Sequence, residues 1–223
     1  YQEAYAEAST YLGYFDHNGC YAYNNNATPE LRRFDRIGNA TVHNCGGTSF
    51  SGNFMNWASS AAIDIVRYAL SGGDRILDTA NETILQRALV PNSEWFWNTY
   101  QYKTLPAAFV QGALPNDLKG THTGNVQITN CLNRIHFGTG HEGSCDAPGA
   151  SSNLGVAAGA NGTKILSSDN FFYSRVKVCE SSGGVLQDPR PDLCTKQLSG
   201  NFKPTGLLQE YSDRLRVGAF GYL

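Results

Sequence analysis

Residues 51–73 read SGNFMNWASSAAIDIVRYALSGG, and this stretch carries the clearest helical pattern of the chain. Its apolar residues recur at steps of three and four, as on one face of an amphipathic helix: Phe54, Trp57, Ala58, Ala61, Ile65, Ala69 and Leu70. Ser51 or Asn53 can cap the start, and Gly72-Gly73 can end the helix. Asp64 and Arg67 lie away from the apolar face, so we expect them to be solvated, paired or part of an interface.

The segments around this helix indicate an α/β protein. A second, shorter helix is predicted from Glu82 to Leu89, stopping before Pro91. Phe171 to Cys179 alternates in the manner of a strand, Thr205 to Arg214 has a helical pattern, and Leu215 to Tyr222 has the composition of a buried strand. A long helix followed later by a helix and a strand favours an α/β core that carries a large insertion.

The rest of the sequence predicts turns and irregular structure. Residues 1–50 are rich in Tyr and Asn, and Asp16-His17-Asn18-Gly19 has the composition of a turn. Residues 92–170 contain scattered Gly and Pro, so we expect an extended insertion with few regular elements there. Four aromatic residues of this insertion either pack in the core or under a loop, or form a contact surface: Trp95, Trp97, Tyr100 and Tyr102.

Composition narrows the class of protein. The chain has 223 residues, of which 41% are hydrophobic and 16% charged, and its formal net charge is −2. This length suits one large domain or two small ones, and the lack of a basic field argues against nucleic acid as a partner. No apolar run reaches the roughly 18 residues that span a bilayer, and no signal-peptide pattern opens the chain. We expect an exported fragment of a longer protein.

The six cysteines fall into three local couples, each enclosing a loop rich in turn-forming residues. The expected disulfides are Cys20–Cys45, Cys131–Cys145 and Cys179–Cys194. Each would stabilise the fold by about 3 kcal/mol through restriction of the unfolded chain. The alternatives are free thiols or a zinc site, although the C-x2-4-C spacing usual in zinc sites does not occur. Disulfides indicate the periplasm, the cell surface or secretion.

Two short patterns match ligand-binding motifs in letters only. Gly138 to Gly143 fits G-x-G-x-x-G, but residues 144–149 cannot form the helix that would face a pyrophosphate. The run from Asp16 to Gly19 resembles the start of a calcium loop, yet Tyr21 stands where that loop needs its glycine. Both patterns predict turns, and we assign no metal-binding residue.

Two enzymatic or sugar-binding alternatives stay open. A secreted hydrolase could draw on these side chains: His122, His136, His141, Asp117, Glu142 and Asp146. The nucleophile-elbow motif G-x-S-x-G and the zinc motif H-E-x-x-H are both absent from the sequence, so we predict no catalytic residue and no enzyme. A secreted carbohydrate-binding module could instead stack sugars on Trp95 and Trp97.

Four segments, taken in order, resemble a known family. They comprise Tyr11 to Tyr23, Ser51 to Gly73, Asp78 to Pro91, and Arg175 to Cys179 with Gly200 to Phe220. Together they are similar to the N-terminal half of the PilC/PilY family, the type IV pilus tip-associated adhesins. Residues 92–170 match weakly, which is where members of such a family are expected to differ.

The resemblance implies a fold. It implies a von Willebrand factor A-like (Rossmann-like) core, incomplete in this chain, with a long, disulfide-pinned, loop-rich insertion. The domain fragment 1–223 would then contain core segments 51–73 and 201–223, an insertion at 74–200 and the Tyr/Asn-rich segment 1–50. The Asp-x-Ser-x-Ser metal loop of such domains does not occur in the sequence, so no metal ligand is carried over.

The resemblance also implies a function. The protein would be exported through the periplasm to the pilus tip or bacterial cell surface, where it would contact minor pilins of a type IV pilus. Its expected roles are pilus biogenesis, cell adhesion to host or abiotic surfaces, and thereby virulence. This implies protein–protein contact, no catalysis and no cofactor in this chain; calcium would belong to flanking regions.

Overall fold

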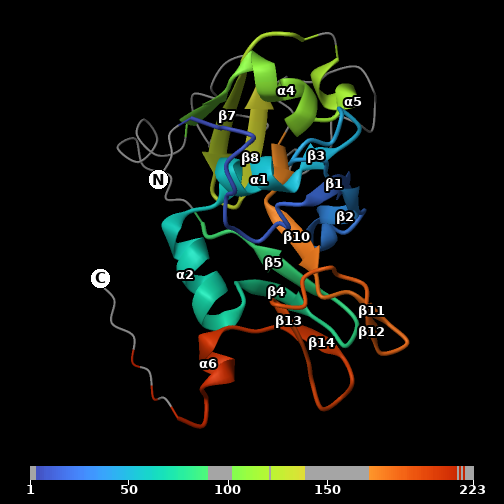
Figure 1. Ribbon diagram of the computed structural model, residues 1–223, viewed down its shortest axis with the longest axis vertical. Coiled ribbons are helices and arrows are strands. Elements are labelled where there is room, and N and C mark those ends of the chain that lie inside the picture. The colour runs from blue at the N-terminus through green and yellow to red at the C-terminus, as the bar shows by residue number, and fades with distance from the viewer. Residues whose placement is uncertain are drawn as a thin grey trace.

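The computed structural model describes residues 4–89, 102–120, 122–138 and 171–214, together with 216 and 218. Its two larger sheets lie one above the other in Figure 1 and meet near helix α1. The lower sheet has six strands in the order β3-β1-β2-β10-β5-β4. They are β1 (Gly19–Asn24), β2 (Arg33–Asn39), β3 (Phe50–Ser51), β4 (Arg75–Asp78), β5 (Thr83–Gln86) and β10 (Arg175–Val178). Only the β2–β10 pair is parallel in this sheet.

The upper sheet is antiparallel and has the order β6-β7-β8-β9. Its strands are β6 (Tyr102–Leu105), β7 (Val126–Cys131), β8 (Arg134–Gly138) and β9 (Phe171–Tyr173). Two short helices follow β6, namely α4 (Ala107–Ala113) and α5 (Asn116–Lys119). Two small ribbons, a 3-10 turn and a last helix complete the described elements: β11 (Ser181–Ser182) with β12 (Val185–Leu186), β13 (Cys194–Lys196) with β14 (Phe202–Pro204), η1 (Pro29–Leu31) and α6 (Leu207–Glu210).

The single helix predicted from the opening stretch is two helices, α1 (Gly52–Ser59) and α2 (Ala62–Ser71). Ser60 and Ala61 between them are extended, with ψ of 134° and 163°. The break follows from Asp64, whose carboxylate accepts a hydrogen bond from the Ala61 N–H at 2.9 Å and so begins a new helix. Apolar spacing alone continues smoothly across such a break, so the sequence pattern did not locate it.

The predicted ends of the stretch are confirmed, but its polar face is not. Ser51 accepts a hydrogen bond from the helix that it starts, and Gly72 ends α2 in the left-handed conformation. Arg67 is paired with Asp74 at 2.5 Å, as expected. Asp64 is buried instead of solvated, which corrects the prediction, because its carboxylate accepts a hydrogen bond from Ala88 in the segment after β5.

The prediction of a helix from Glu82 to Leu89 is wrong. Thr83–Gln86 forms strand β5, which pairs with both β4 and β10. Ile84 and Leu85 point to opposite faces and both are fully buried, as in a strand covered on two sides. A short run with helical spacing is decided by its neighbours, and here two strands flank it.

The remaining predicted elements are confirmed in part. The strand over Phe171 to Cys179 is interrupted at Ser174, where the chain passes from the upper sheet to the lower one. The helix predicted over Thr205 to Arg214 is shortened to α6 and followed by turns. Apart from 216 and 218, the strand predicted over Leu215 to Tyr222 lies outside the described residues.

One hydrophobic core joins both sheets and α1. Among its largest fully buried side chains are Tyr21, Phe34, Phe54, Phe137 and Phe172. Several of these rings pack edge-on or tilted, with Phe137 and Phe172 centroids 5.7 Å apart, a spacing at which aromatic pairs attract. The core therefore draws on distant parts of the sequence.

The predicted insertion contributes regular structure to this core. Residues 102–138 (121 excepted) hold strands β6 to β8 and helices α4 and α5, so the prediction of few regular elements is wrong for that part. Residues 90–101 and 139–170 lie outside the described residues. The α/β class is confirmed. The von Willebrand factor A-like core and the division into core and insertion stay predictions.

Candidate functional site

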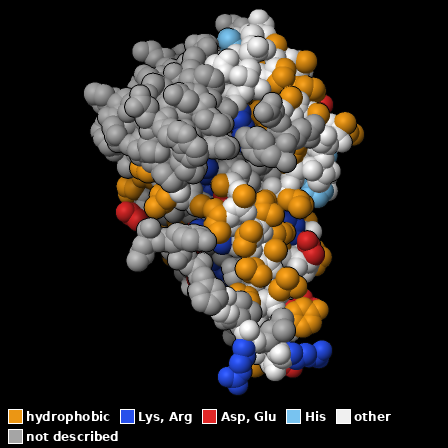
Figure 2. All heavy atoms as spheres, turned by 90° about the vertical axis from the view of Figure 1, so that its left-hand side faces the viewer, with side chains coloured by type: hydrophobic (Ala, Val, Ile, Leu, Met, Phe, Trp, Pro, Cys, Tyr) orange, Lys and Arg blue, Asp and Glu red, His pale blue; other side chains and the backbone are white. Residues whose placement is uncertain are grey.

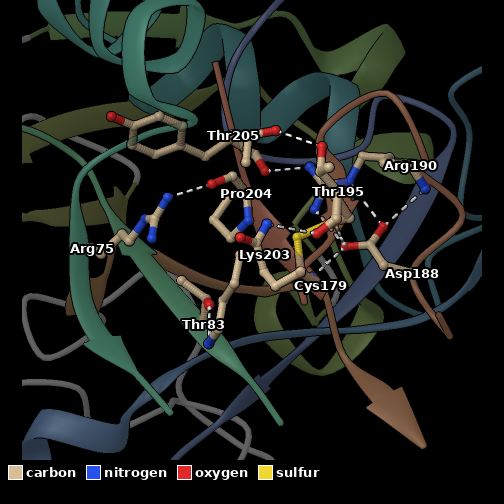
Figure 3. The surroundings of a disulfide bond; sticks show 12 residues. Arg75, Thr83, Cys179, Asp188, Arg190, Thr195, Lys203, Pro204 and Thr205 are labelled. Carbon is tan, nitrogen blue, oxygen red and sulfur yellow. Dashed lines mark hydrogen bonds and ion pairs between the residues drawn. A yellow bond between two sulfur atoms is a disulfide. The ribbon is translucent and has the colours of Figure 1, made fainter. Parts of the chain in front are cut away.

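A disulfide fixes the β13–β14 ribbon beside the lower sheet. Cys179 directly follows β10 and Cys194 begins β13, with Cα atoms 5.3 Å apart, which confirms the predicted pair. Figure 3 shows the ribbon held on its other side as well, where the Thr195 and Thr205 hydroxyls lie 2.6 Å apart. The disulfide thus joins β13 to the end of β10, and hydrogen bonds join β13 to β14 and to Thr205.

An ion pair fills the loop that the disulfide encloses. The Arg190 guanidinium donates to both carboxylate oxygens of Asp188, at 3.1 and 3.0 Å (Figure 3). Arg190 also donates to the Tyr14 carbonyl at 2.6 Å, and the Cys179 N–H donates to Asp188 at 2.9 Å. The bond to Tyr14 ties the loop to the N-terminal segment, 176 residues away in sequence.

The side chains of this pair are largely enclosed, 9% exposed for Arg190 and 5% for Asp188, and both are ionised. Burial raises the pKa of Asp188, but the charge and hydrogen bonds of Arg190 and the Cys179 N–H outweigh burial and lower the pKa below its ordinary value. Burial lowers the pKa of Arg190, but Tyr21 and Asp188 raise it overall. A closed, fully hydrogen-bonded pair of this kind orients a loop, and neither group is available for proton transfer near neutral pH.

A groove of about 750 Å³ lies between the ribbon, α2 and α6. Its lining carries the charged side chains Asp192, Lys196 and Glu210 and the apolar Leu198, which is fully exposed at the ribbon tip. This volume lies within the roughly 300–1,000 Å³ of ligand sites, and the mixed lining suits a peptide or protein surface. The disulfide and the ion pair fix the wall of this groove.

An apolar face adjoins the groove. Ile63, Val66 and Leu70 lie on one side of α2 and are 47%, 48% and 36% exposed, and Leu207 of α6 is 46% exposed. Figure 2 views the side of the molecule that carries α2 and shows hydrophobic side chains gathered there. We call these four residues the α2 stripe. Large apolar side chains that share one exposed face mark a contact surface more often than single ones do.

A metal site is not built in this region. The ligand atoms of Cys179, Asp188 and Cys194 lie within 4.8 Å of one another. Both sulfur atoms belong to the disulfide, however, and only a thiolate binds a metal well. Asp188 also already receives bonds from Arg190 and a backbone N–H. The described residues therefore offer no free ligand set here.

The aromatic contact surface predicted from the sequence lies mostly outside the described part of the chain. Trp95, Trp97 and Tyr100 lie outside the described residues. Tyr102 is the first residue of β6, where it pairs with Thr129 of β7. The predicted Cys131–Cys145 disulfide also involves a residue outside the described part, whereas Cys20–Cys45 is confirmed, with Cα atoms 5.8 Å apart.

The histidines of the hydrolase alternative are divided between different environments. His136 is buried in β8, while His122 lies in a turn, its Nε2 2.9 Å from the Asn125 carbonyl oxygen. Asp117 is exposed on α5. His141, Glu142 and Asp146 lie outside the described residues.

Sequence reasoning missed the Asp188–Arg190 pair. The sequence Asp188-Pro-Arg-Pro191, inside a loop closed by cysteines, was the available signal. Prolines on both sides of Arg190 restrict the backbone and favour a fixed side-chain direction. The target of that direction, the Tyr14 carbonyl, cannot be read from the local sequence.

Comparison with known proteins identifies the family. The family model described as "PilY1 homolog, small alpha/beta domain" matches residues 2–144. The chain belongs to the PilY1 homolog family. Two proteins of Xylella fastidiosa (strain Temecula1), each named "Type IV pilus biogenesis factor PilY1 homolog", are 31% and 26% identical to it over 99% and 96% of its length. The chain spans only 18% and 15% of these relatives.

The PilY1 family membership confirms the resemblance found in the sequence. It also agrees with the mixed α/β structure, since the matching model describes a small α/β domain. No solved structure matches the chain. Within the described residues, no helix has the length and apolar character that a membrane crossing requires.

Proposed function

We propose that this chain is a contact module of a type IV pilus biogenesis factor and acts through protein–protein binding without catalysis. The observation that carries the proposal is the α2 stripe beside the disulfide-braced groove. It exposes large apolar side chains on a fixed frame, which is what a stable protein interface needs at its centre. The naming of the relatives supports a pilus-related role.

The finer parts of the proposal concern place and partner. The module would act after export, at the pilus tip or cell surface, contacting minor pilins and contributing to adhesion to host or abiotic surfaces. Two disulfides that close loops support an oxidising location. We also propose that α1 and α2 belong to a von Willebrand factor A-like core in the whole protein, and the resemblance of the sequence to the PilC/PilY family supports this. A structure of a longer form in which α1 and α2 flank no parallel sheet of this kind would refute it.

The function is tested in the bacterium that encodes the protein. Val66→Glu places a charge in the α2 stripe without disturbing the core, because Val66 is half exposed. We expect fewer surface pili and weaker co-purification of minor pilins, at unchanged protein level. Val185→Glu is the matched control, since Val185 is similarly exposed on the distant β11–β12 ribbon. Equal piliation in both variants and the parent would refute the proposed role of this face.

A further inference from the structure

Strand β1 is paired along only part of one side. β2 pairs with it from Gly19 to Asn24, whereas β3 pairs only with Cys20 and Tyr21. β3 cannot extend, because the chain enters α1 at Gly52 and bends away from β1 at Ser49. Within the described part of the chain, the outward backbone groups of residues 22–24 have no hydrogen-bond partner on that side. The sheet therefore ends in a short open edge.

The opposite edge of the same sheet carries charged side chains and contacts the β13–β14 ribbon at both ends of β4. Lys203 of β14 donates to the Asp78 carboxylate at 2.5 Å and to the Thr79 carbonyl, both at the end of β4. Arg75 of β4 donates to the Pro204 carbonyl (Figure 3). Proteins usually cover or charge an edge strand, since its free N–H and C=O groups recruit other strands. The contrast makes the uncovered edge of β1 a candidate for recruitment.

A pocket of about 330 Å³ opens beside this edge. Its walls are mostly apolar: Tyr21, Tyr23, Phe50, Pro115, Leu118 and Phe172. The far wall is fixed, because the Asn116 N–H at the start of α5 donates to the Gly47 carbonyl at 2.7 Å. The volume is near the lower limit of about 300 Å³ for ligand sites, which suits one large side chain better than a chain of sugars.

A carboxylate stands at the rim of this pocket. Asp117 lines it, is exposed, and forms no ion pair within the described part of the structure. The pocket lining contains no Lys or Arg side chain among its described residues. A basic side chain on an incoming peptide would therefore find an unopposed charge next to the apolar pocket.

We propose that the open edge of β1 binds an extended segment of a partner protein as an added strand in line with β3. The main chain of that segment would pair with residues 22–24, an aromatic or branched aliphatic side chain would fill the pocket, and a Lys or Arg would face Asp117. This is strand addition, in which main-chain bonds supply affinity and alternate side chains supply specificity. The inference rests on the proposed function only in taking a protein as the partner.

The test uses a displayed library of random linear dodecapeptides selected against this chain. We expect the enriched peptides to share alternating apolar residues and a basic residue. Their binding should shift the backbone amide signals of Ala22, Tyr23 and Asn24 in the ¹⁵N spectrum of the chain. N-methylation of alternate peptide residues should weaken binding at least about tenfold on one peptide edge only, because only one edge pairs with β1.

Two matched variants test whether a Lys or Arg of the peptide contacts Asp117. Asp117→Asn should weaken the selected peptides about threefold or more, as expected for an exposed charge pair. Asp213→Asn, an equally exposed aspartate away from the pocket, should leave the affinity unchanged. Both changes lie on the surface, and an unchanged ¹⁵N spectrum of each free variant verifies its fold.

Several results would overturn the inference. The selection could enrich no peptide, or the selected peptides could shift amide signals other than those of residues 22–24. N-methylation could also weaken binding equally on both peptide edges. A dimer in sedimentation that pairs β1 with β1 would make a second copy the occupant. Because the α2 stripe is probed by Val66→Glu in cells and β1 by peptides in solution, the two proposals can fail separately.

Discussion

Asp64 and Ala88, 24 residues apart, are joined by a hydrogen bond of 2.7 Å from the Ala88 N–H to the Asp64 carboxylate. The other carboxylate oxygen accepts from the Ala61 N–H at 2.9 Å. One buried side chain thus starts α2 and anchors to it the segment that follows β5. This contact holds the helix that carries the α2 stripe in its place on the lower sheet.

Removal of this carboxylate should destabilise the fold. Asp64→Ala leaves two backbone N–H groups without an acceptor, and we expect the free energy of unfolding to fall by about 2–3 kcal/mol. Urea unfolding followed by tryptophan fluorescence measures the change. The control is Asp213→Ala at an exposed position, where we expect less than about 0.5 kcal/mol. A loss equal to that of the control would contradict the anchoring role.

The Asp188–Arg190 pair should make stability depend on acid pH. The pKa of Asp188 is lowered in the folded protein, against burial, by Arg190 and hydrogen bonds. The folded state therefore binds fewer protons than the unfolded chain, whose aspartates titrate near about 3.9. This stabilisation is present above pH of about 4 and is lost as the pH falls through the folded pKa.

The variant Asp188→Asn isolates this contribution. We expect the variant to have a lower free energy of unfolding at pH 7. That free energy should also fall less steeply between pH of about 4 and 2, because the variant lacks the carboxylate that takes up the proton. Urea unfolding at a series of pH values measures both. Asp213→Asn should keep the acid dependence of the parent protein, and an equally steep decline in Asp188→Asn would assign that dependence to other groups.

The Cys179–Cys194 disulfide should raise the free energy of unfolding by several kcal/mol. Cys179 and Cys194 are 15 residues apart, and a loop of that size corresponds to about 3 kcal/mol. We expect Cys179→Ala with Cys194→Ala to lose that amount in urea unfolding. The Cys20 and Cys45 pair, 25 residues apart, should lose slightly more. An unchanged stability in both double variants would refute a structural role.

Peptide mapping without reduction tests the whole pairing scheme. The two described disulfides should appear as linked fragments. The prediction that Cys131 joins Cys145 should appear as a third. A fragment linking Cys131 to any other cysteine would refute it.

Lys103 should titrate well below an ordinary lysine. Burial, helped by repulsion from Arg87, lowers its pKa to about 8. The Cε carbon signal, assigned by its loss in Lys103→Arg, should therefore shift with a midpoint near 8. The unfolded chain, with a lysine pKa of about 10.4, binds the proton more tightly, so this group makes stability rise with pH between about 8 and 10. A midpoint above 10 would contradict the buried environment.

The residues that shape the frame of the candidate site differ in whether their roles can be predicted from the sequence. Gly72 and Ser51 marked the helix ends correctly, because caps are local backbone requirements. Asp64 and Arg190 could not be assigned in this way. Their partners, Ala88 and the Tyr14 carbonyl, come from chain segments brought near only by folding.

The sequence by itself determined the disulfides Cys20–Cys45 and Cys179–Cys194, the outer ends of the helical stretch 51–73, the α/β class and the family. Each of these depends on neighbouring residues or on ordered motifs along the chain. Only the tertiary structure decided that Thr83–Gln86 is a strand, that Asp64 is buried, and that β1 has an open edge within the described part of the chain. The physical reason is that strand pairing and burial depend on which distant segment lies alongside, and spacing along one segment carries no record of that.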